Sequence, residues 1–102
     1  MKQHTYEVTL KHVADAQGNP STYADTLSFN TYNHDDIFKV LQVIQNSQML
    51  DAEAAKSFAV GLKLFSEVML EHKNFPLFKD FMPHFGQFMK TLKQTVKTPS
   101  QS

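Results

Sequence analysis

The sequence predicts an α+β fold, in which an N-terminal antiparallel β-hairpin is followed by three to four helices packed on one face of the sheet. Two short runs in the first third alternate apolar and polar residues, which is typical of strands with one buried face. In the remaining chain, apolar residues recur every three or four positions, which is typical of amphipathic helices. Strands followed by helices is the element order of an α+β domain.

The hairpin is predicted from residues 6–12 and 23–32. One face of the first run carries Tyr6, Val8 and Leu10, and one face of the second carries Leu27, Phe29 and Thr31. The segment 15–21 between them holds Gly18 and Pro20 within a polar stretch, which is a strong turn signal. The two runs are therefore expected to pair as antiparallel strands joined by a long loop.

The first helix is predicted over residues 34–45. Asn33 is a favourable N-cap residue, and Asp35 and Asp36 would then place negative charge in the first turn, at the positive end of the helix dipole. The polar segment 46–48 is expected to end this helix.

The second helix is predicted over residues 51–73, with Asp51 as its N-cap and Glu53 in its first turn. Its apolar residues cover most of its circumference, so we expect a central helix that packs on two sides. Gly61 lies inside this helix and Gly86 inside the next, where each costs about 1 kcal/mol relative to alanine. A close crossing of the two helices near these glycines would explain that cost.

A phenylalanine stripe marks the last third of the chain. It consists of Phe75, Phe78, Phe81, Phe85 and Phe88, and is continued by Leu92 and Val96. Pro83 cannot donate a backbone hydrogen bond, so we expect a short helix over 76–81, a kink or restart, and a second helix over 83–96. We interpret the stripe as hydrophobic core, because five exposed phenylalanines would promote aggregation. The alternative is an adaptable groove for an apolar ligand or a partner helix.

Length and composition indicate one domain over residues 1–97 and a disordered polar tail over 98–102. The chain has 102 residues and no cysteine, which excludes disulfides and thiolate metal sites and fits a reducing cytoplasm. We expect a cytoplasmic protein, because the N-terminus lacks the apolar segment of a secretory signal and no apolar run is long enough to span a membrane.

The charged residues argue against nucleic-acid binding. Ten lysines balance ten acidic residues and there is no arginine, whereas nucleic-acid binding needs a basic surface. Lys90, Lys93 and Lys97 form one positive stripe, and no acidic residue follows Asp80. The stripe is either a docking face for an acidic partner or a solvated helix end whose lysines complement the dipole.

The densest group of catalytic residue types is His34, Asp35 and Asp36. Adjacent helical residues point about 100° apart, so these three do not converge on one ion, and capping accounts for both carboxylates. The remaining histidines, at positions 4, 12, 72 and 84, form no metal-binding motif. We assign no catalytic, cofactor-binding or metal-binding residue, and we expect no cofactor.

The predicted hairpin has two open edges and would be marginally stable by itself. Pairing of two hairpins across a two-fold axis would remove one edge from each chain. A homodimer through the hairpin edge is therefore expected.

Five segments together resemble a small bacterial family of uncharacterised proteins, a domain-of-unknown-function family. They are residues 18–20 (GNP), 33–38 (NHDDIF), 59–70 (AVGLKLFSEVML), 76–78 (PLF) and 83–90 (PHFGQFMK). The resemblance implies a short bacterial cytoplasmic protein with a hairpin followed by helices. It implies no activity, cofactor or catalytic residue.

Three functions follow as hypotheses. The first is a non-catalytic protein-interaction or regulatory module, whose unknown protein partner docks on the sheet edge, the sheet face or a groove between helices. The second is a binder of a small apolar ligand in the helical half. The third is an enzyme that uses His34 and the adjacent carboxylates.

Overall fold

The computed structural model describes residues 2–97, and the predicted tail over 98–102 lies outside these residues. The chain divides into two compact units between His34 and Asp35. The first unit holds two strands and the second holds three helices, so the predicted α+β class and element order are confirmed. The single domain over residues 1–97 and the packing of the helices on the sheet stay predictions.

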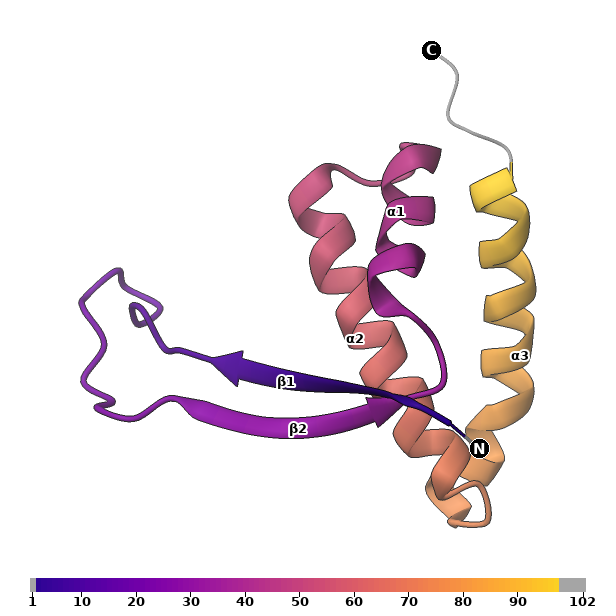
Figure 1. Cartoon of the computed structure of the whole chain (residues 1–102), viewed down its shortest axis with the longest axis horizontal. Coiled ribbons are helices and arrows are strands. Elements are labelled where there is room, and N and C mark those ends of the chain that lie inside the picture. The colour runs from indigo at the N-terminus through magenta and orange to yellow at the C-terminus, as the bar shows by residue number, and fades with distance from the viewer. Residues whose placement is uncertain (1, 98–102) are drawn as a thin grey trace. The chain divides into compact units, whose positions relative to one another are not determined.

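The first unit is an antiparallel hairpin of β1 (His4–Leu10) and β2 (Leu27–Asn33) (Figure 1). Val8 lies opposite Phe29, and the pairs on either side of it are Tyr6 with Thr31 and Leu10 with Leu27. These are the residues that the alternation placed together, so the predicted grouping is correct. The prediction that this face is buried is wrong, because Leu10, Leu27 and Phe29 remain 65%, 57% and 43% exposed. β1 has the length of the predicted run but begins earlier, at His4. β2 is shorter than the predicted run and begins only at Leu27.

The loop between the strands is held by local hydrogen bonds to Asp15. Its carboxylate accepts from the backbone N–H groups of Asn19 and Gln17, at 2.9 Å each. These bonds stabilise the ionised carboxylate, and the one from Asn19 contributes most to lowering the Asp15 pKa below its ordinary value. Gly18 has a φ of 90°, a conformation that L side chains rarely adopt.

The first helix of the second unit, α1, is Ile37–Ser47 and is capped by Asp36. The Asp36 carboxylate accepts from the backbone N–H groups of Phe38 and Lys39, at 3.1 and 3.3 Å. The prediction of Asn33 as the cap was therefore wrong by three residues, because Asn33 still pairs with β1 as the last residue of β2. No acidic residue lies in the first turn of α1, since Asp35 and Asp36 precede it.

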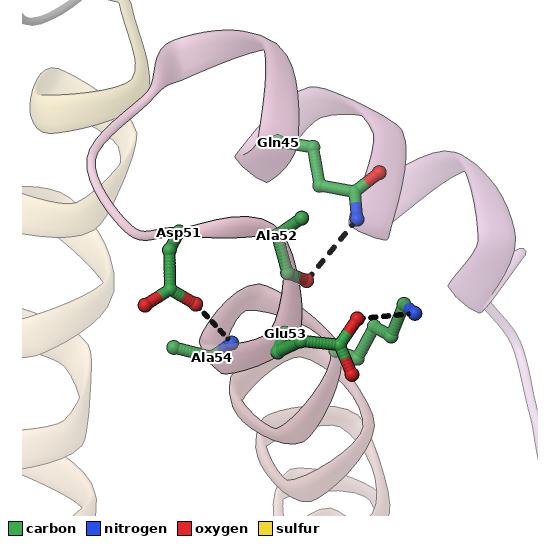
Figure 2. Close-up of polar contacts among 6 residues, drawn as sticks. Gln45, Asp51, Ala52, Glu53 and Ala54 are labelled. Atoms are coloured by element: carbon green, nitrogen blue, oxygen red, sulfur yellow. Dashed lines mark hydrogen bonds and ion pairs between the residues drawn. The ribbon is translucent and has the colours of Figure 1, made fainter.

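The turn from α1 into α2 (Ala52–Glu71) is shown in Figure 2. As predicted, Asp51 caps α2 and Glu53 lies in its first turn; the Asp51 carboxylate accepts from Ala54 N–H at 2.7 Å. The Gln45 side chain donates to the Ala52 carbonyl at 3.3 Å, which ties the end of α1 to the start of α2. The chain reverses here because Gln48, at φ 61°, ends α1 in a left-handed conformation.

The third helix, α3, is one uninterrupted helix from Pro76 to Lys97. The predicted restart at Pro83 is therefore wrong. Pro83 and Lys79 are both exposed, so water can bind the Lys79 carbonyl that loses its helical partner. The ring of Phe65 also contacts Phe81 before the proline and Phe85 after it, and so holds both halves against α2.

The helical core is small. Its centre is Ile44, Ala55 and Ala59, surrounded by partly buried side chains that include Phe58 and Val96. The predicted close crossing at the two interior glycines is wrong, because a Cβ added to Gly61 or Gly86 would meet no atom within 4 Å.

Candidate functional site

The helical unit carries an aromatic seam where α2 faces α3. Its members are Phe58 and Phe65 on α2, and Phe78, Phe81, Phe85 and Phe88 on α3. The ring centroids of Phe65 and its three partners on α3 lie 6.3 to 6.5 Å apart, and Phe58 lies 6.3 Å from Phe88. These are ordinary separations for favourable aromatic pairs.

The seam is only partly covered, and α3 contains no buried residue. Phe81 and Phe88 remain 42% and 45% exposed, and Phe65 remains 46% exposed. Phe78 and Phe85 are half-buried. The interpretation of the phenylalanine stripe as core is therefore wrong for Phe75, Phe81 and Phe88, which keep about half of their surface.

One end of the seam forms an open hollow. It is lined by Phe65 on α2 and by Leu77, Phe78, Asp80, Phe81 and His84 on α3. Its lining is almost entirely apolar, although one carboxylate and one imidazole stand at its border. The rings of His84 and Phe81 are stacked at 6.3 Å, so His84 belongs to this aromatic surface.

A second depression, the α1–α3 groove, runs between these two helices over α2. Its apolar lining is Val40, Val43, Ile44, Leu62, Met89, Leu92 and Val96, and Lys63 and Lys93 also line it. Val43 is 52% exposed, whereas Ile44 at the bottom is buried. The groove was not predicted from the sequence, because Val43 and Leu92 are far apart along the chain.

The charged residues that α1 and the second half of α3 contribute beside this groove are all lysines. On α3, Lys90, Lys93 and Lys97 follow one another at helical spacing, and no acidic residue follows Asp80. On α1, Lys39 is the single charged residue. The Lys63 ammonium is neutralised by an ion pair with the Asp35 carboxylate.

The structure does not bring His34, Asp35 and Asp36 together as one cluster of free groups. Asp36 caps α1, and Asp35 forms the ion pair with Lys63, whose side chain is only 14% exposed. The prediction that these carboxylates stabilise the start of a helix is confirmed for Asp36, which caps α1. For Asp35 the role differs, because its ion pair with Lys63 joins the residues just before α1 to α2.

The other histidines lie in separate places. His4 stacks on Tyr6, while His12 is hydrogen-bonded to the Ser21 hydroxyl at 2.6 Å and makes an edge contact with Tyr23. His72 is the C-cap residue of α2. Within residues 2–97, no three histidine, aspartate or glutamate side chains are placed so that they could hold a metal ion.

Glu67 on α2 is a buried charged residue. It is only 7% exposed, although glutamate is almost never fully buried unless it is paired. Among the described helices, none is long and apolar enough to cross a membrane.

The fold and this apolar surface define a small α+β protein made of a β-hairpin unit and a three-helix unit. A family of domains of unknown function with a solved structure, DUF3861, matches residues 4–94. The chain belongs to this family, so the predicted resemblance is confirmed. No curated protein matches the sequence.

The fold is also similar to a crystal structure of a protein of unknown function from the bacterium Pectobacterium atrosepticum. The two sequences are 38% identical, and the match covers 91% of this chain and 99% of that chain with a TM-score of 0.77. The hairpin followed by helices is therefore shared with this bacterial relative.

Proposed function

We propose that the protein is a non-catalytic protein-interaction module, and that its partner docks on the exposed apolar surface of the helical unit. One observation carries the proposal: α3 is a 22-residue helix with four phenylalanines and not one buried residue. An amphipathic helix normally covers its apolar face, and a large exposed apolar patch marks an interaction surface.

The aromatic seam has the chemistry of an interface centre. Phe81 and Phe88 are already held by neighbouring rings, so little side-chain freedom remains to be lost when a partner covers them. Aromatic residues that are ordered before binding and covered afterwards dominate the affinity of many interfaces. We propose no catalytic role for His34, because both neighbouring carboxylates have structural partners.

The proposal is tested with the double variant F81Q/F88Q and the control Tyr23→Gln, which alters an exposed residue of the hairpin loop. Proteins captured from the native bacterium by each bait are compared by mass spectrometry. A candidate partner is then purified and titrated against three proteins, namely the unaltered chain and the two variants. Circular dichroism verifies that each is folded. We expect F81Q/F88Q to weaken binding at least about tenfold, or 1.4 kcal/mol, and Tyr23→Gln to change it less than about twofold. Equal binding by all three proteins would contradict the proposal.

We also propose that the hairpin edge forms a homodimer. Within the described residues, β1 and β2 pair only with each other, so the outer edge of each strand is open to a further strand. Light scattering after size-exclusion chromatography measures the mass directly. A dimer should have twice the chain mass of 11.7 kDa, whereas a single 11.7 kDa species at high micromolar concentration would refute this contact.

A small apolar ligand is the second candidate, favoured by the hollow beside Phe65, Phe81 and His84. A fluorescent apolar probe such as anilinonaphthalene sulfonate should then bind with saturation, and Leu77→Lys should abolish the signal. Binding that is unchanged in Leu77→Lys would exclude the hollow as the site.

A further inference from the structure

We propose that the α1–α3 groove binds an amphipathic helix of a partner protein, with the apolar face of that helix in the groove and its acidic side chains against the bordering lysines. The inference rests on the proposed function and names the chemistry of the partner. Of the two interpretations of the lysine stripe, the inference takes the docking face for an acidic partner and not the solvated helix end.

The apolar lining is arranged in two rows that suit a helix. Met89, Leu92 and Val96 follow one another at intervals of three and four residues along α3. On the facing side, α1 contributes Val40 and Val43, one turn apart. A helix laid along the groove would meet both rows at once with its residues at i, i+3, i+4 and i+7.

The lysines border this lining rather than lying elsewhere on the helix. Lys93 lines the groove itself, and Lys90 and Lys97 precede and follow it by one turn on the same face of α3. Lys39 stands one turn before Val43 on α1. A solvated helix end needs no apolar groove beside its lysines, whereas a site for an acidic amphipathic helix needs both.

The charge pattern also selects among occupants. Between Ile37 and Ser47 there is no acidic residue, and after Asp80 there is none in α3. Placing α1 or α3 of a second copy in the groove would therefore bring lysines against lysines, which costs free energy. An acidic partner gains attraction from the same lysines and associates faster.

The test uses two synthetic 18-residue helical peptides as probes. Both carry leucines at helical spacing; one has glutamates beside the leucine row and the other has lysines at the same positions. Binding to the full chain is measured by fluorescence anisotropy at low and high salt. We expect the glutamate peptide to bind at least about tenfold more tightly than the lysine peptide, and to lose affinity as salt screens the charges.

Two variants locate the site and one serves as control. K90E/K93E reverses the charge beside the groove, and Val43→Gln changes an exposed apolar residue of its lining. Lys79→Glu makes one such charge reversal on α3 outside the groove. The first two should weaken the glutamate peptide at least about tenfold, and Lys79→Glu less than about twofold.

The inference is overturned if the glutamate peptide does not bind, if the lysine peptide binds equally well, or if Lys79→Glu has the same effect as K90E/K93E. Capture of the native partner by F81Q/F88Q and by K90E/K93E distinguishes failure of this inference from failure of the proposed function. If F81Q/F88Q loses that partner while K90E/K93E keeps it, the interaction module stands and the acidic-helix site fails. If both F81Q/F88Q and K90E/K93E lose the partner and it binds through an acidic helix, both are supported.

Discussion

The ring of Phe65 on α2 lies 6.3 Å from the ring of Phe81 on α3, at an interplanar angle of 60°. The same ring also contacts Phe78 and Phe85, so one side chain joins α2 to α3 on both sides of Pro83. Phe65 remains 46% exposed, which makes it both a support of α3 and part of the surface that we propose for docking.

Phe65→Ala should lower the free energy of unfolding by about 1–3 kcal/mol, less than for a fully buried phenylalanine because half of the ring is already in water. The control Phe38→Ala removes a ring that is 73% exposed and should change stability by less than about 0.5 kcal/mol. Urea unfolding followed by circular dichroism measures both. Equal effects of the two substitutions would show that the seam does not hold α3.

The ion pair between Asp35 and Lys63 should stabilise the contact between the start of α1 and the middle of α2, because the Lys63 side chain is only 14% exposed. Asp35→Asn removes a negative charge that lies against this mostly buried ammonium, and should cost about 1–3 kcal/mol. Glu53→Gln removes a more exposed ion pair, with Lys56, and should cost less than about 0.5 kcal/mol. A double-mutant cycle with Lys63→Met isolates the coupling, and a coupling energy near zero would rule out this role.

Gly61→Ala and Gly86→Ala should each raise the free energy of unfolding by about 0.5–1 kcal/mol, since alanine favours the helix and a new Cβ meets no atom within 4 Å. Gly18→Ala is the opposite case. Its φ of 90° is strained for alanine, so this substitution should cost about 1–2 kcal/mol. Thermal unfolding compares the three variants; destabilisation by Gly61→Ala would reveal a close contact at that position.

Asp15 should titrate below the same residue in a peptide of its own loop sequence, because backbone hydrogen bonds from Asn19 and Gln17 lower its pKa in the folded protein. A lowered pKa means that this carboxylate stabilises the folded loop above its unfolded pKa. That contribution is lost as the pH falls through the folded pKa. Carboxyl carbon chemical shifts followed by NMR measure both pKa values, and equal values would contradict the hydrogen-bonded loop.

Local features of the fold were predictable from the sequence. The alternation of Tyr6, Val8 and Leu10 identified the face that pairs with Leu27, Phe29 and Thr31. Asp51 was recognised as the cap of α2 from its residue type and position. Such features depend on neighbours along the chain or on strict periodicity, so the sequence contains the information needed.

Features that depend on distant contacts were not predictable. Pro83 predicts a break by its own chemistry, yet contacts of Phe65 with Phe81 and Phe85 support a continuous helix. Asn33 is a favourable cap, but strand pairing extends to it and moves the cap to Asp36. In both cases a tertiary or cross-strand contact outweighs a local preference of about 1–3 kcal/mol.

The sequence by itself determined the α+β class, the strand faces and the presence of an aromatic stripe at helical spacing, because periodicity records which side chains share a face. Only the tertiary structure decided how much of that stripe is covered. Burial depends on how closely α2 and α3 approach, and here Phe81 and Phe88 keep nearly half of their surface. The same structure brings Val43 of α1 beside Leu92 and Lys93 of α3, and so forms an apolar groove bordered by positive charge from residues far apart in the chain.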